Sequence, residues 1–114
     1  MTWNDLLERM ESAGLHPIEE TFMENFGKVL AAQRAEFRDR YFRCTYGVVN
    51  CLDTRIEVFL FPDPAQSTEF LDLAGTDPWW FMLSNAVLHF SECDPFVIQR
   101  VLTALQGNEM KTEN

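Results

Sequence analysis

Histidine, cysteine and carboxylate side chains could hold a metal ion, and they are thinly spread in this chain. His89 and Cys93 lie four residues apart, a spacing that on a helix presents two ligands to one metal ion, and Glu92 is adjacent. The other histidine and cysteines are scattered without a Cys-x-x-Cys pair: His16, Cys44 and Cys51. Because structural zinc sites take four ligands, we expect no metal site and interpret Cys93 as a small buried apolar residue.

Catalytic patterns are also missing from the sequence. A nucleophilic pair of cysteine and histidine is possible in any fold, but no spacing here favours one. The chain has no Gly-x-Ser-x-Gly motif, no glycine-rich phosphate loop and no dinucleotide-binding fingerprint. The aspartates of Asp63-Pro64, Asp77-Pro78 and Asp94-Pro95 are each placed to cap a helix whose first turn holds the proline. We therefore expect neither enzymatic activity nor a cofactor.

The charge balance argues against direct binding to nucleic acid. Of the 114 residues, 18 are acidic and 9 are basic, which gives a net charge of −9. Binding to a phosphate backbone needs clustered basic side chains that release counterions. Most of the basic residues lie between Lys28 and Arg43, but Glu36 and Asp39 interrupt them. This stretch is interpreted as the solvated face of a helix.

Cysteine usage and hydropathy indicate the compartment. The three cysteines are odd in number and show no paired spacing, which is typical of a reduced protein. The N-terminal residues Met-Thr-Trp-Asn-Asp lack the basic and apolar regions of a secretory signal. No stretch approaches the roughly 18 uninterrupted apolar residues that a membrane helix needs. We expect a cytoplasmic protein without contact to a membrane.

Hydrophobic periodicity predicts one α+β domain over residues 1–107, followed by a polar tail over 108–114. Two N-terminal helices are expected. The first begins near Thr2 or Asn4 and ends at Gly14, where a left-handed backbone is cheap. The second is expected over about 17–40, with apolar residues spaced by threes and fours along one stripe.

A change of period to two predicts a β-hairpin after the second helix. Its strands are expected around 42–48 and 56–60, where polar and apolar residues alternate. The three Asp-Pro pairs then predict three C-terminal helices, over about 64–74, 78–92 and 95–106. The predicted fold is therefore two helices, one hairpin and three helices in a single compact domain.

The expected helix over 78–92 is apolar on two sides. One broad stripe contains Trp79, Trp80, Leu83, Ala86, Val87 and Phe90. Phe81 and Leu88 fall on nearly the opposite side, with Met82 beside His89. A helix apolar on two sides must be buried on two sides, in its own domain or against a second chain. We therefore predict a partner-binding site formed by Phe81, Leu88, Met82 and Trp80.

The aromatic content also favours association. Ten Phe, three Trp and two Tyr present more large apolar surface than a small domain buries easily. The composition therefore predicts a homodimer or an obligate protein partner.

In length, acidity, predicted element order and lack of catalytic motifs, the chain resembles QslA-type quorum-sensing antiactivators. The resemblance implies a regulator that binds the ligand-binding domain of a LuxR-type transcription factor and blocks its dimerisation. Two alternatives stay open. A type III secretion chaperone would use hydrophobic patches to hold an unfolded effector segment. An immunity protein or inhibitor would cover a basic surface of its partner with acidic side chains.

Overall fold

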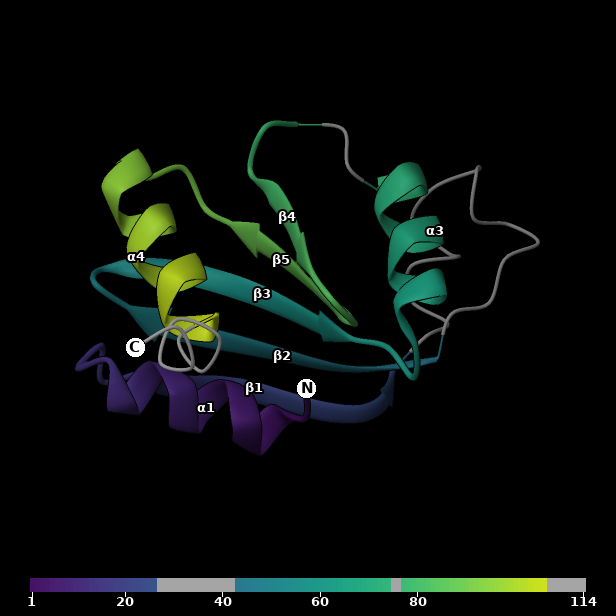
Figure 1. Cartoon of the computed structure of the whole chain (residues 1–114), viewed down its shortest axis with the longest axis horizontal. Coiled ribbons are helices and arrows are strands. Elements are labelled where there is room, and N and C mark those ends of the chain that lie inside the picture. Colours follow the sequence, from purple (N-terminus) through teal and green to yellow (C-terminus); the bar gives the residue numbers. More distant parts are fainter. Residues whose placement is uncertain (27–42, 75–76, 107–114) are drawn as a thin grey trace, which may run out of the picture.

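The computed structural model describes residues 1–26, 43–74 and 77–106 (Figure 1). The helices are α1 (Trp3–Ser12), α3 (Pro64–Ala74) and α4 (Pro95–Leu105). The strands are β1 (Ile18–Phe26), β2 (Cys44–Cys51), β3 (Thr54–Leu60), β4 (Trp80–Leu83) and β5 (Ala86–Phe90). Within these ranges, no helix has the length and apolar content needed to cross a membrane.

The strands form one five-stranded sheet in the order β1-β2-β3-β5-β4, and every neighbouring pair is antiparallel. Among the described strands, β1 and β4 therefore lie at the two edges. The turn from β2 to β3 has only Leu52 and Asp53 between its last paired residues, and both have positive φ. Two residues in this conformation match the right-handed twist of the strands that they join.

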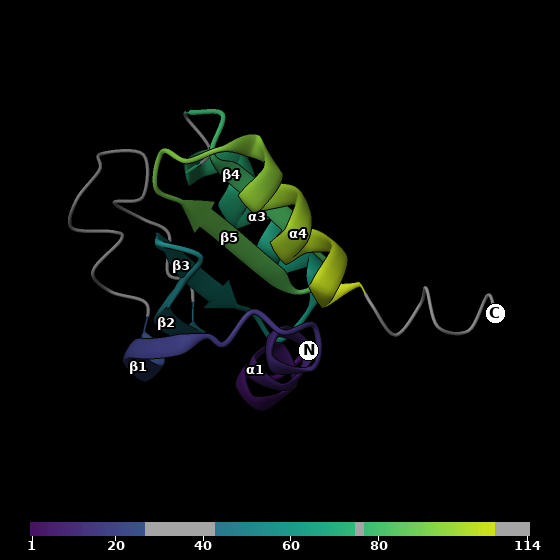
Figure 2. The same cartoon turned by 90° about the vertical axis from the view of Figure 1, so that its left-hand side faces the viewer.

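Helices cover the two faces of the sheet unequally. On one face, α1 and α4 lie side by side, as Figure 2 shows, and Arg9 of α1 donates a hydrogen bond of 2.8 Å to the carbonyl oxygen of Leu105 in α4. The core under these helices includes Leu6, Met10, Val49, Ile56, Val58, Leu88, Phe90 and Val101. On the other face, α3 covers one end of the sheet, over Cys44, Phe59, Phe61 and Val87.

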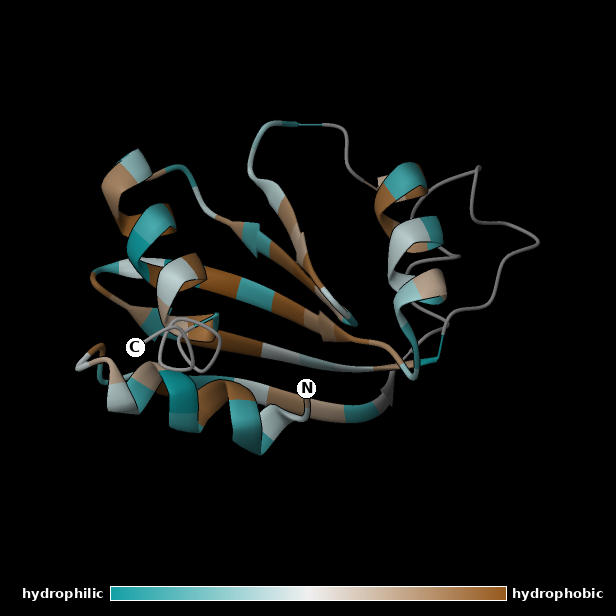
Figure 3. Ribbon diagram, in the orientation of Figure 1, coloured by the Kyte–Doolittle hydropathy of each residue, from teal (hydrophilic) through white to brown (hydrophobic). Residues whose placement is uncertain are grey.

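The central strands are hydrophobic along most of their length (Figure 3). In β5, Ala86, Leu88 and Phe90 belong to the core under α1 and α4, whereas Val87 belongs to the cluster under α3. Successive side chains of a strand point to opposite faces. The strand is therefore apolar on both sides because both sides are covered.

The prediction of a helix over 78–92 is wrong, because this segment forms the hairpin of β4 and β5. Its turn lies at Ser84 and Asn85, and Ser84 has a φ of 55°. Aromatic and β-branched residues suit strands. A segment buried on both sides loses the two-residue alternation that would identify a strand, and periodicity then cannot separate it from a buried helix.

The prediction of a second N-terminal helix from Pro17 is also wrong. Residues 18–26 form β1, which pairs with β2 from Ile18↔Asn50 to Phe26↔Cys44. The four-residue spacing of Ile18, Phe22 and Phe26 satisfies a helical pattern, but pairing with β2 overrides that local preference. The remainder of the expected helix, 27–40, lies outside the described residues. The chain is α+β, but the predicted arrangement of two helices, one hairpin and three helices does not match it.

Two C-terminal helices agree with their predicted ranges. Helix α4 begins with a cap in which the Asp94 side chain accepts a hydrogen bond from the Phe96 amide. At the start of α3, Asp63 accepts hydrogen bonds from the amide and the side chain of Gln66. Asp94 and Asp63 therefore act as helix caps, as their Asp-Pro pairs predict.

Trp3 fixes α1 on the sheet. Its indole Nε1 donates a hydrogen bond to Glu19 of β1, and its ring lies with its centroid 5.4 Å from that of Phe22. Its six-membered ring lies directly over Gly47 of β2, where an added Cβ would be 2.1 to 2.8 Å from the ring carbons. Glycine is therefore required at position 47 by the approach of the tryptophan ring.

We predict that Gly47→Ala lowers the free energy of unfolding by about 1–3 kcal/mol, the usual cost of overpacking a core. Urea denaturation measures the change. In a Trp3→Ala background the same substitution should cost much less, because the ring that the methyl group meets is gone. An equal cost in both backgrounds would contradict the assignment of the clash to Trp3.

Candidate protein-binding surface

The structure separates the four residues predicted to bind a partner. Phe81 and Leu88 lie opposite each other on β4 and β5 and face α1 and α4. Leu88 is only 1% exposed, and Phe81 is half-buried against Phe90, with ring centroids 5.6 Å apart. Leu88 therefore belongs to the core, and its side chain contacts no partner while the sheet is intact.

Trp80 and Met82 lie on the opposite face of the hairpin. The Trp80 ring stacks on His89 at 4.1 Å between centroids, and its centroid lies 6.0 Å from that of Phe59 and from that of Phe70. Met82 is 38% exposed, and its sulfur accepts a hydrogen bond from Thr68 of α3. Of the four predicted residues, only Met82 is classed as exposed.

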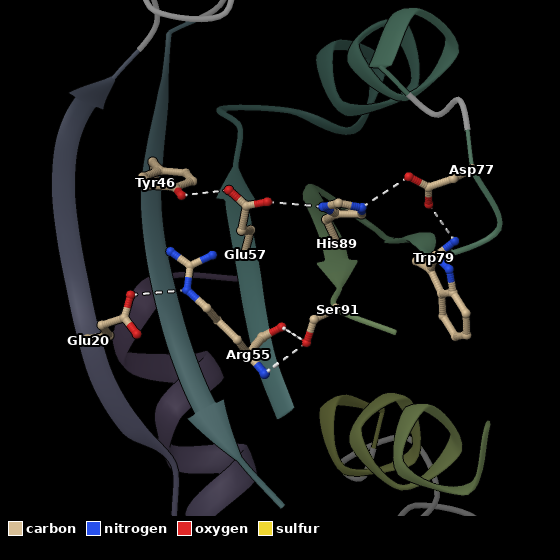
Figure 4. A network of polar contacts seen from close by, with 8 residues as sticks. All are labelled: Glu20, Tyr46, Arg55, Glu57, Asp77, Trp79, His89 and Ser91. Carbon is tan, nitrogen blue, oxygen red and sulfur yellow. Dashed lines mark hydrogen bonds and ion pairs between the residues drawn. The ribbon is translucent and has the colours of Figure 1, made fainter. Parts of the chain in front are cut away.

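A polar network occupies the part of this face that α3 does not cover (Figure 4). The His89 ring lies between two carboxylates, with Nδ1 at 3.0 Å from Glu57 and Nε2 at 3.3 Å from Asp77. Tyr46 donates a hydrogen bond of 2.7 Å to the other oxygen of Glu57. Asp77 also accepts a hydrogen bond from the Trp79 amide. Asp77 thus stands before β4 and not, as predicted, at the start of a helix.

A second group of polar contacts on the same face reaches β1 through Arg55 (Figure 4). Its guanidinium lies 3.1 Å from Glu20, which also accepts a hydrogen bond from Asn50. The hydrogen bonds from Asn50 and Arg55 lower the pKa of Glu20, and Glu20 raises the pKa of Arg55. Burial and, secondarily, the bond to Glu57 raise the pKa of Tyr46. These contacts tie β1, β2, β3 and β5 together across the open half of the face.

The two hydrogen-bonding partners of the His89 ring are carboxylates. Among the described residues, no cysteine, serine or threonine side chain forms a hydrogen bond with this ring. His89 lies on the α3 face, whereas Cys93 packs against the core under α1 and α4. The two residues with metal-ligand spacing in the sequence therefore lie on different sides of the sheet. Among the described residues, no three potential ligands gather around one point.

Exposed large apolar side chains concentrate on β1. Ile18 is 67%, Phe22 42% and Met23 43% exposed. Among the described residues, the other exposed members of this class stand singly elsewhere: Met82 on β4 and Phe96 on α4. Sequence analysis missed this surface because it assigned residues 18–26 to a helix. The available signal was the β preference of Thr21, Phe22 and Phe26, which the helical spacing outweighed.

The edge of β1 lacks some of the usual protection. Edge strands are commonly short, or carry charged side chains, proline or bulges, which hinder pairing with another chain. β1 has nine residues and contains neither lysine nor proline, although it carries three glutamates and two register shifts interrupt its pairing with β2. Between these shifts, Thr21, Phe22 and Met23 pair regularly with Val48, Gly47 and Tyr46. None of the other described strands pairs with the outer side of this stretch, where its backbone groups could meet a further strand.

We predict that Leu88→Ala lowers the free energy of unfolding by about 2–5 kcal/mol, because it leaves a cavity in the core. Met82→Ala, at the exposed edge of the same hairpin, should change it by less than about 0.5 kcal/mol. Thermal and urea unfolding of both variants test the difference. A similar small loss in both would show that Leu88 is not part of the packed core.

The cysteines should differ in reactivity. Burial raises the pKa of Cys44 to about 12 and that of Cys51 to about 11, so at mildly alkaline pH almost none of either thiol is the reactive thiolate. Cys93 is half-buried. We predict that iodoacetamide labels Cys93 first in the native protein, and all three cysteines after unfolding. Peptide mass spectrometry identifies the sites, and equally fast labelling of Cys44 in the native state would contradict its burial.

Comparison of this chain with protein-family models, with curated proteins and with solved structures gave no match.

Proposed function

We propose that this protein is a small acidic protein-binding regulator that holds an extended segment of a partner beside β1. The observation that carries the proposal is the edge strand that exposes Ile18, Phe22 and Met23 together. A partner strand would gain main-chain hydrogen bonds from the edge and specificity from alternate side chains. Burying one large apolar side chain contributes about 1.5–3 kcal/mol, so these residues supply useful binding energy.

The geometry favours one of the alternative partner classes. An unfolded effector segment, the cargo of a secretion chaperone, is extended and could lie along the strand edge. A LuxR-type transcription factor, implied by the antiactivator resemblance, would instead have to present a strand or terminus of a folded domain. We propose the unfolded effector segment as the first candidate partner and the LuxR-type domain as the second. The proposed role is non-enzymatic. We also propose a cytoplasmic location, which the three cysteines support because all are free thiols.

A pair of matched positions tests the proposal. Met23 and Met82 are the same residue type, are similarly exposed and lie on strands at opposite edges of the sheet. We predict that a photo-crosslinking amino acid at position 23 forms a specific adduct in the source cells, whereas the same group at position 82 does not. The crosslinked peptide, identified by mass spectrometry, should come from an extended region of another protein.

The adduct also separates the alternatives. A peptide from the ligand-binding domain of a transcription factor would support the antiactivator, and one from a secreted effector would support the chaperone. A peptide from a second copy of this chain would identify β1 as the interface of the expected homodimer and overturn binding of a different protein there. Adducts at position 82 alone would move the binding surface to β4, where Met82 and Trp80 were predicted to act.

A further inference from the structure

An open groove of about 750 Å³ lies directly beside the exposed edge. Its walls come from β1, from the first residues of α1 and from the ends of β2 and β3. Phe22 and Trp3 supply aromatic surface, and Leu60 at the end of β3 adds an aliphatic side chain to the wall. Three residues of β1 line the groove: Glu19, Phe22 and Glu24. A strand added to that edge would therefore pass the mouth of the groove.

The pleat of the strand divides the side chains of such a segment between two surfaces. Phe22 pairs with Gly47 and faces α1, whereas Met23 pairs with Tyr46 and faces the opposite side of the sheet. Successive residues of an added strand point to these two sides in turn. Every second side chain would reach the groove, and those between would reach the surface that carries Met23.

The charge of the groove determines which side chain it suits. Glu19 and Glu24 contribute carboxylates, while Arg43 and the terminal ammonium of Met1, which donates a hydrogen bond to Asn85, contribute positive charge. The Glu19 carboxylate is bonded to the Trp3 indole. Glu24 is exposed and, within the described part of the chain, its side chain makes no hydrogen bond or ion pair. A cation with a long apolar stem could pack that stem on Phe22 and place its charge beside Glu24.

We infer that the groove receives a lysine or arginine side chain from an extended partner segment in which basic and apolar residues alternate, the apolar ones lying on the Met23 side. The inference rests on the proposed function and specifies the chemistry of its partner. The net charge of −9 adds long-range attraction for such a segment.

Short fluorescent peptides test the inference by anisotropy. One alternates valine with lysine, a second alternates valine with glutamate, and a third alternates valine with serine. A fourth repeats the lysine peptide with a central proline, which prevents strand pairing but keeps the charge. The lysine peptide should bind about tenfold or more tightly than the glutamate peptide and the proline control.

Matched carboxylate variants locate the charge contact. Glu24→Gln should weaken binding of the lysine peptide about two- to fivefold, as for a solvent-accessible ion pair, and should leave the serine peptide unchanged. Glu92→Gln removes a carboxylate that is also exposed but does not line the groove, and should change neither. Circular dichroism melts check that both variants are folded.

The outcomes distinguish the two proposals. Equal binding of the lysine, glutamate and serine peptides, with all three weakened by Met23→Lys, would overturn the basic preference and leave edge binding intact. If Glu24→Gln and Glu92→Gln weaken binding of the lysine peptide equally, the preference for basic peptides results from net charge alone. This outcome would overturn binding of the basic side chain in the groove. If none of the peptides binds more tightly than the proline control, both proposals are overturned.

Discussion

The contact of the Trp3 ring with Gly47 determines where α1 lies, and the surface beside it depends on that placement. The ring leaves no room for a side chain at position 47, so helix and strand approach more closely than a Cβ would permit. The same residue holds Glu19 and touches Phe22, which positions β1 from one side. One aromatic side chain thus links α1, β1 and β2. It also sets the wall of the groove that β1 shares with the first residues of α1.

Helices and strands were predicted correctly where a local sequence pattern is compatible with only one structure. The Asp-Pro pairs at Asp63 and Asp94 mark real helix starts, because a capping carboxylate followed by proline has few other uses. The hairpin of β2 and β3 was predicted because its alternation is partly preserved. The Asp77-Pro78 pair was wrongly predicted to begin a helix. The Asp77 carboxylate instead contacts His89 and the Trp79 amide, and no spacing in the sequence indicates these contacts.

The errors in the candidate site share one physical origin. Residues 78–92 do have apolar side chains on two sides. The reason is that they include a strand with helices over both faces of its sheet, and not a helix packed between the core and a partner protein. Leu88 was assigned to a partner because its burial by α1 and α4 depends on residues distant in the sequence. Conversely, the helical spacing of Ile18, Phe22 and Phe26 concealed the exposed edge. Only the pairing with β2 reveals which of those side chains remain uncovered.

The hydrogen bond from Arg9 to the Leu105 carbonyl joins elements from opposite ends of the described chain. The core beneath them draws on both helices, so α1 cannot bury its apolar face fully before α4 has been made. Synthesis runs from the N-terminus and is slower than local folding. Helix α1 would therefore leave the ribosome before α4, and Leu6 and Met10 would stay partly uncovered in the meantime. Late closure of such distant contacts slows folding. The apolar face of α1 in a nascent chain therefore stays partly uncovered until α4 emerges.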